Sequence, residues 1–200
     1  MLVVSYYHSV GLRDFAAGVS ALKLRYGIWF AACAGFCAGG LVPEIAKLAT
    51  GGLRKFNKAW IATTFFNGFV YAIVAIQVDL FYRLQAFLFG PQHDIRTLVI
   101  KTAVDMGLFA PIISIPSATV LLVWRRNRFS LRPMFTDGLR VFILRDVIPG
   151  LIPCWFFWTP VLFCTYSMPV DLQLVFSTLM EAAWSIVFIF ISNESQVPAP

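Results

Sequence analysis

Five long apolar stretches constrain the fold of this chain more than any other feature of its sequence. They are residues 27–42, 60–78, 104–124, 147–168 and 172–192. A helix that spans the hydrocarbon core of a bilayer needs about 20 mostly apolar residues, and only the first stretch is clearly short of that length. Because lipid offers the backbone no hydrogen bonds, helices are expected, and the alternating pattern of barrel strands is missing. The sequence therefore predicts an all-α transmembrane bundle of four to five spanning helices, with amphipathic interfacial segments.

Composition supports a membrane location for these stretches. Hydrophobic residues make up 59% of the chain and charged residues only 13%, whereas soluble domains carry about 25% charged residues. The net charge is +6, but the basic residues lie between the apolar stretches, where they act as topology signals and contact lipid headgroups. We therefore expect the lipid bilayer as the partner and no nucleic acid.

The chain divides into three parts along its length. Residues 1–26 mix aromatic and charged residues and predict an N-terminal interfacial segment, residues 27–192 form the transmembrane helical domain, and residues 193–200 are a polar tail. Pro111 and Pro116 predict a kink in the third apolar stretch, and Pro43 followed by Glu44 predicts the end of the first. Pro169 predicts a tight reversal between the last two, unless one of them is only half inserted.

The distribution of basic residues predicts the orientation. Ten of the sixteen lysines and arginines flank the loops that follow the first and third apolar stretches. The positive-inside rule therefore places these two loops in the cytoplasm, or in the matrix of a mitochondrion, and the N-terminus on the other side.

Small residues recur every four positions in the first apolar stretch, at Gly27, Ala31, Gly35 and Gly39. This spacing places all four on one helix face, where small side chains allow two helices to approach closely. The pattern predicts a packing seam, either between two copies of the chain or within one bundle.

Several polar residues interrupt the apolar stretches. Glu181 lies midway through the last one, where an ionisable group costs roughly 2.5–3.5 kcal/mol, so it should face the bundle interior. Asp79 and Asp105 stand near one membrane edge and are candidates for buried polar or pore residues. Lys101, one turn before Asp105, is the expected partner of Asp105 if the two form a structural pair. Asn67 is a further candidate for a hydrophilic path or a helix-packing hydrogen bond. Weaker polar residues on the same stretches are Gln77, Ser114, Ser117 and Thr119.

No residue set points to catalysis. The chain has no HExxH, G-x-S-x-G, P-loop or GxGxxG motif, so we expect no enzyme and no catalytic residues. Its four cysteines lie in apolar stretches without a CxxC pair, and only two histidines are present, so neither a metal nor another cofactor is expected.

Several short motifs lie between about residue 39 and residue 192. They are Phe81-Tyr82 followed by Leu84, the segment from Lys101 through Asp105 to Pro111, Trp155, Trp158-Thr159-Pro160, Pro169 and Trp184. Together these motifs resemble the Mpv-17/PMP-22 family of integral membrane proteins. The first is similar to the element that closes the second helix of that family, and the second is similar to its Lys-x-x-x-Asp-Gln segment and the Ala-Pro that follows.

The resemblance implies a membrane protein of at least four helices, and some members of the family are described as non-selective channels for small solutes. Met106, Gln173 and Pro43-Glu44 depart from the usual pattern in ways that look like bacterial members. We therefore expect the bacterial inner membrane, with a mitochondrial inner or peroxisomal membrane as the alternative.

Two functions of different kinds follow from these features. The first is a channel or pore for small solutes, favoured by the resemblance and by the polar residues within the spans. The second is a structural or accessory subunit, in a homo-oligomer or a larger membrane complex, favoured by the small-residue seam and the lack of a chemical motif.

Overall fold

The computed structural model describes residues 10–49, 57–90, 94–130, 132 and 138–194, with the backbone alone at positions 10, 12, 13, 16, 171 and 186–194. These residues form helices and, in the ranges just given, no strand. The elements are α2 (Val10–Tyr26), α3 (Ile28–Phe36), η1 (Cys37–Leu41), α4 (Val42–Ala49), α5 (Lys58–Phe89), α6 (Ile95–Val104), η2 (Asp105–Ser114), α7 (Ile115–Arg126), α9 (Leu139–Phe142), η3 (Ile143–Val147), α10 (Ile148–Tyr166) and α11 (Val170–Glu194). The all-α prediction is confirmed.

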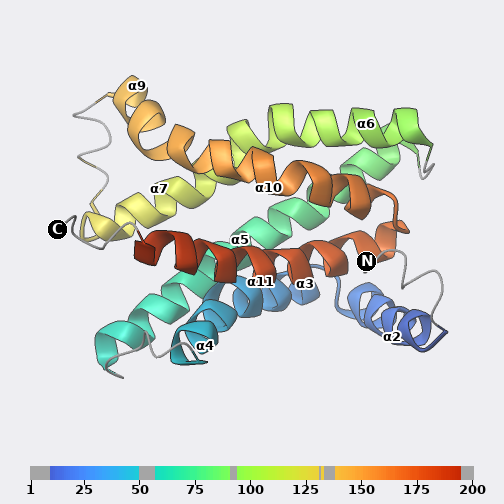
Figure 1. Cartoon of the computed structure of the whole chain (residues 1–200), viewed down its shortest axis with the longest axis horizontal. Coiled ribbons are helices and arrows are strands. Elements are labelled where there is room, and N and C mark those ends of the chain that lie inside the picture. Colours follow the sequence, from blue (N-terminus) through green and yellow to red (C-terminus); the bar gives the residue numbers. More distant parts are fainter. Residues whose placement is uncertain (1–9, 50–56, 91–93, 131, 133–137, 195–200) are drawn as a thin grey trace.

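In the part of the chain that the structure describes, four continuous helices are long and apolar enough to cross a bilayer, and the chain is an integral membrane protein by this criterion. They run over Ile28–Ala49, Lys58–Phe89, Ile95–Arg126 and Leu139–Tyr166, with mean hydropathies of 1.5 to 2.0. Each is longer than its sequence prediction. At about 1.5 Å per residue the 32 residues of α5 exceed the roughly 30 Å hydrocarbon core, and α5 crosses the bundle diagonally (Figure 1).

The last apolar stretch forms α11, a helix of 25 residues. It begins at Val170, four residues after α10 ends at Tyr166, and it runs back beside α10 (Figure 1). The amide of Leu172 bonds to the carbonyl oxygen of Pro169 at 2.9 Å, so Pro169 lies just before the first turn. The predicted tight reversal is confirmed.

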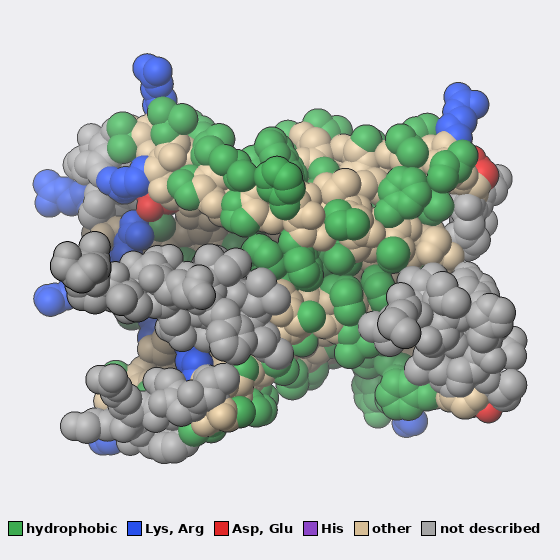
Figure 2. Space-filling view, in the orientation of Figure 1, with side chains coloured by type: hydrophobic (Ala, Val, Ile, Leu, Met, Phe, Trp, Pro, Cys, Tyr) green, Lys and Arg blue, Asp and Glu red, His purple; other side chains and the backbone are tan. Residues whose placement is uncertain are grey.

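The surface of the bundle is largely apolar, and several polar side chains lie inside it. Phe87 and Phe156 are 85% and 82% exposed, and hydrophobic side chains cover the middle of the bundle, while lysines and arginines gather at its two ends (Figure 2). Buried side chains include Asp79, Gln85 and Gln173. Only a solvent of lipid makes this distribution favourable, because lipid accepts exposed apolar groups and excludes polar ones.

Within the described residues, three π-helical segments each precede one of the prolines in the spans. η1, η2 and η3 end at residues 41, 114 and 147, and each is followed two residues later by Pro43, Pro116 or Pro149. Proline donates no backbone hydrogen bond, and its ring clashes with the carbonyl one turn earlier. The wider π turn moves that carbonyl away, so the helix continues. The prediction that Pro43 and Glu44 end the first helix is therefore wrong. Pro111 lies inside η2 and Pro116 just after it, and the kink expected there stays a prediction.

Pro111 leaves one carbonyl oxygen to be satisfied from another helix. In the i to i+5 spacing of η2, the carbonyl of Met106 would bond to the amide of residue 111, which is a proline. The indole Nε1 of Trp155 on α10 donates to this Met106 oxygen at 2.8 Å. The two helices are thus tied at the point where the backbone ladder is broken.

We expect Trp155→Phe to destabilise the protein by about 1–3 kcal/mol, because it leaves the Met106 carbonyl without a donor in lipid. The measurement is unfolding in detergent micelles followed by circular dichroism. In a Pro111→Ala background the backbone regains an amide at this position, and the same Trp155→Phe change should cost clearly less. Equal costs in the two backgrounds would show that the indole acts only through packing.

The small-residue seam packs within one chain. Ala31 is fully buried, and Gly35 and Gly39 face Tyr71 of α5; a Cβ on Gly35 would lie 2.5 Å from the carbonyl oxygen of Tyr71. Gly27 does not belong to this seam: it caps α3 at a φ of 53°, and no atom lies within 4 Å of a Cβ built on it. Its positive φ instead turns the chain between α2 and α3.

The N-terminal segment contains α2, which is not among the candidate spans, and α2 is held by a buried charge. Lys23 of α2 is 3% exposed and its Nζ lies 3.2 Å from Asp79 of α5, whose second oxygen lies 2.7 Å from Arg83. Lys23 also donates to the carbonyl oxygen of Val170 at 3.4 Å. This lysine joins α2 to α5 and α11.

Side chains cap the helices at their polar ends. The Asn57 side chain accepts from the Trp60 amide at the start of α5, at 2.8 Å, and Gly90 ends that helix with a φ of 76°. Asp94 caps α6 through the hydroxyl and amide of Thr97, at 2.7 and 3.1 Å. These hydrogen bonds hold the pKa of Asp94 below its usual value.

Candidate functional site

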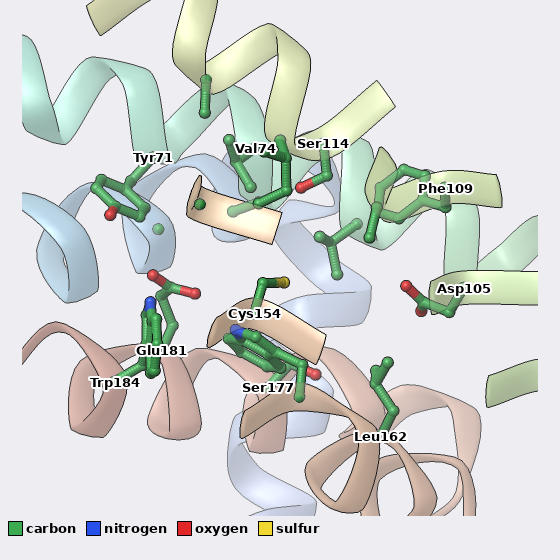
Figure 3. Close-up of a pocket in the computed structure, with 18 of the residues that line it drawn as sticks. Tyr71, Val74, Asp105, Phe109, Ser114, Cys154, Leu162, Ser177, Glu181 and Trp184 are labelled. Atoms are coloured by element: carbon green, nitrogen blue, oxygen red, sulfur yellow. The ribbon is translucent and has the colours of Figure 1, made fainter. Parts of the chain in front are cut away.

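A cavity of about 250 Å³ lies at the centre of the bundle, between α3, α5, η2, α7, α10 and α11. Its walls are mainly apolar, with hydroxyl groups and two carboxylates among them (Figure 3). The polar and aromatic residues that line it are Tyr71, Tyr82, Asp105, Phe109, Ser114, Thr119, Trp158, Ser177, Thr178, Glu181 and Trp184. The cavity brings together polar residues from several spans.

Glu181 projects from α11 into this cavity, as its position in an apolar stretch predicted. Figure 3 shows its carboxylate between Tyr71 and Trp184. No described residue forms an ion pair or a hydrogen bond with it. The carboxylate therefore faces the cavity, where a bound molecule or water can reach it.

Asp105 lines the same cavity from η2 and is 4% exposed. One of its oxygens accepts a hydrogen bond from the Tyr166 hydroxyl at 2.6 Å, and that hydroxyl accepts in turn from Gln85 Nε2 at 2.7 Å. The expected pair between Asp105 and Lys101 is wrong. Lys101 donates to the carbonyl oxygen of Gly90 at 2.7 Å, since its long side chain reaches back to the open end of α5.

Residues of the family resemblance form the wall near Asp105. Tyr82 is buried and its hydroxyl shares a hydrogen bond of 2.6 Å with Ser177. Phe81 stacks on Phe109, with ring centroids 4.1 Å apart. Trp158 and Trp184 line the cavity, whereas Pro160 is exposed on α10 and Pro111 lies in η2.

Ser114 and Thr119 also line the cavity, whereas the other polar candidates lie outside it. Asp79 is buried, as expected of it, but its ion pairs with Lys23 and Arg83 place it beneath α2. Asn67 is half-buried on α5 and does not line the cavity. Ser117 donates to Gln77 Oε1 at 3.0 Å and so joins α7 to α5. Asp79, Ser117 and Gln77 therefore act in helix packing rather than at the cavity.

Sequence reasoning missed Gln85, Tyr166, Ser177 and Tyr71. Gln85 lies beyond residue 78, where the second apolar stretch ends, although α5 continues to Phe89. A search for polar residues one helical turn apart along an extended α5 would have found Tyr82 and Gln85 together. Tyr71, Tyr166 and Ser177 carry single hydroxyls in apolar stretches, which gives no local sign of their partners.

The lining combines acidic side chains with apolar and aromatic walls. Within the described residues, no group of three or more histidine, cysteine, aspartate or glutamate side chains comes together to hold a metal ion. Among those residues, the lining also contains no lysine, arginine or histidine. The cavity is therefore acidic, and it has apolar and aromatic walls.

Comparison with known proteins identifies no similar protein. No family model matches the chain, and neither a curated protein nor a solved structure matches it at a significant level.

Proposed function

We propose that this protein is a channel or pore that passes small solutes across its membrane. The observation that carries the proposal is the central cavity, which brings carboxylates and hydroxyl groups from η2, α7 and α11 together inside the bundle. Polar groups are costly within a membrane, so a cavity that gathers them is a typical solute site. The resemblance to the Mpv-17/PMP-22 family supports the same function, and the proposal involves no covalent chemistry.

The alternative is an accessory subunit with no transport activity of its own. The small-residue seam favoured it, but Gly35 and Gly39 are already covered by Tyr71 and Ala75 of the same chain. The seam thus gives no reason to expect a partner helix on that face. The membrane we propose remains the bacterial inner membrane, with the mitochondrial inner or peroxisomal membrane as alternatives, on the strength of the resemblance.

Ion conductance in a planar bilayer tests this function. We expect purified protein to conduct and Ala118→Phe to remove most of the conductance, because Ala118 lines the cavity and a phenyl ring would fill it. Ala62→Phe is the matched control, since Ala62 is exposed on α5 and an added ring there enters lipid. A folded wild-type protein without conductance would favour the accessory subunit instead.

A further inference from the structure

We propose that the central cavity binds a small organic cation, with an ammonium head and a short apolar body. The inference rests on the proposed function in one respect: such a cation would be the solute that the channel transports. Equilibrium binding at the cavity is a separate property, and it can be measured whether or not the protein conducts.

The charge of the cavity selects a cation. Glu181 has no charged or hydrogen-bonded partner among the described residues, and Asp105 has one neutral partner, Tyr166. The cations that are buried nearby are engaged elsewhere: Lys101 bonds to Gly90 and Lys23 lies against Asp79. A carboxylate inside a bundle is costly unless it is paired, and a positively charged guest supplies the missing partner. A guest anion would be repelled by both carboxylates.

The separation of the two carboxylates favours a guest that is longer than a single ion. Figure 3 shows Glu181 and Asp105 on opposite sides of the cavity, with Cys154 and Ser177 between them. The space between is lined largely by apolar side chains, including Val74 and Leu162. Methylene groups fit such a wall better than a shell of water does, because the transfer of apolar groups out of water is favourable.

Aromatic side chains near each carboxylate suit an ammonium head. Tyr71 and Trp184 lie beside Glu181, and Tyr82 and Trp158 line the cavity with Asp105. The faces of such rings attract alkylammonium groups, and this attraction grows when the cation is desolvated. An inorganic cation such as calcium takes six to eight oxygen ligands, far more than two separated carboxylates offer. The ring-lined acidic cavity thus discriminates in favour of the organic cation.

Calorimetric titration of the full chain in lipid nanodiscs tests the site with three probes of similar size. They are n-butylammonium, 1-butanol as its neutral counterpart and pentanoate, a butyl chain with a carboxylate, as its anionic counterpart. We expect n-butylammonium to bind most tightly and pentanoate not to bind. A charged hydrogen bond contributes about 1–1.5 kcal/mol more than a neutral one, so the preference over 1-butanol should be about tenfold. Equal affinity for n-butylammonium and 1-butanol would overturn the proposal without any variant.

Variants locate the binding. Glu181→Gln and Asp105→Asn each keep the shape of the side chain and remove its charge, and each should weaken n-butylammonium binding by about tenfold or more. Glu44→Gln is the matched control: Glu44 is also buried, but it bonds to Lys47 and Trp60, both at 2.6 Å, away from the cavity. It should leave the affinity unchanged. Unchanged affinity in both cavity variants would place the cation elsewhere and refute the site.

The two proposals fail in different ways. Conductance with no preference for n-butylammonium in the titration would refute the cation site and leave the channel standing. Tight, Glu181-dependent binding in a protein that does not conduct would refute the channel and leave the site standing.

Discussion

Gly35→Leu is expected to disrupt the bundle more than any other single substitution considered for this chain. A Cβ at this position would lie 2.5 Å from the backbone oxygen of Tyr71 and would overlap the Cβ of Ala75. Neither atom is the end of a flexible side chain, so α3 and α5 have to separate. Overpacking that side chains can absorb by shifting costs about 1–3 kcal/mol. A clash with backbone atoms cannot be absorbed in this way, so we expect a larger loss of stability, about 5 kcal/mol or more. Thermal unfolding and size-exclusion chromatography in detergent measure the effect.

Gly107→Leu is the matched control for this experiment. Gly107 lies in η2 on another span, is exposed, and has no atom within 4 Å of the position that a Cβ would occupy. The same leucine there should leave stability unchanged, because the side chain enters lipid. If Gly35→Leu were as stable as Gly107→Leu, the four-residue spacing would be an accident of composition.

Asp79→Leu is expected to have the second largest effect. The change leaves the Lys23 ammonium, whose side chain is 4% exposed, buried without its counter-ion. Loss of one partner from a buried pair costs about 3–5 kcal/mol. Arg83 is half exposed and can turn towards water, so the cost arises mainly at Lys23. We expect a lower unfolding temperature and cleavage within α2 at lower protease concentrations than in the wild type.

The double variant Lys23→Met/Asp79→Leu separates charge from packing. It removes both charges and keeps chains of similar length, so most of the lost stability should return. Asp146→Leu is the control for the substitution itself. Asp146 pairs with Arg126 and Arg145, which are 61% and 48% exposed and can turn towards water. Its loss should therefore cost about 1 kcal/mol or less. A double variant no more stable than Asp79→Leu would mean that the aspartate acts through its shape.

The sequence alone was enough for the class of fold and for the residues that a membrane makes costly. Whether a stretch spans a bilayer depends on its own length and polarity, so the helices could be placed without knowledge of their neighbours. The same reasoning placed Glu181 inside, because lipid penalises any ionisable group that faces it. The ends of the helices were harder to predict, because π turns carry the backbone past Pro43 and Pro116. Nothing in the local sequence marks where such π turns form.

The partners of these residues were decided only by the tertiary structure. Lys101 and Asp105 are one turn apart, yet Asp105 bonds to Tyr166, which is 61 residues away, because the packing of α10 brings that hydroxyl beside η2. Gly27 shares the spacing of Gly35 but lies outside the helix, because the chain turns there. A side chain's partner depends on how each helix is rotated and crossed against the others, and that is set by long-range packing rather than by the local pattern.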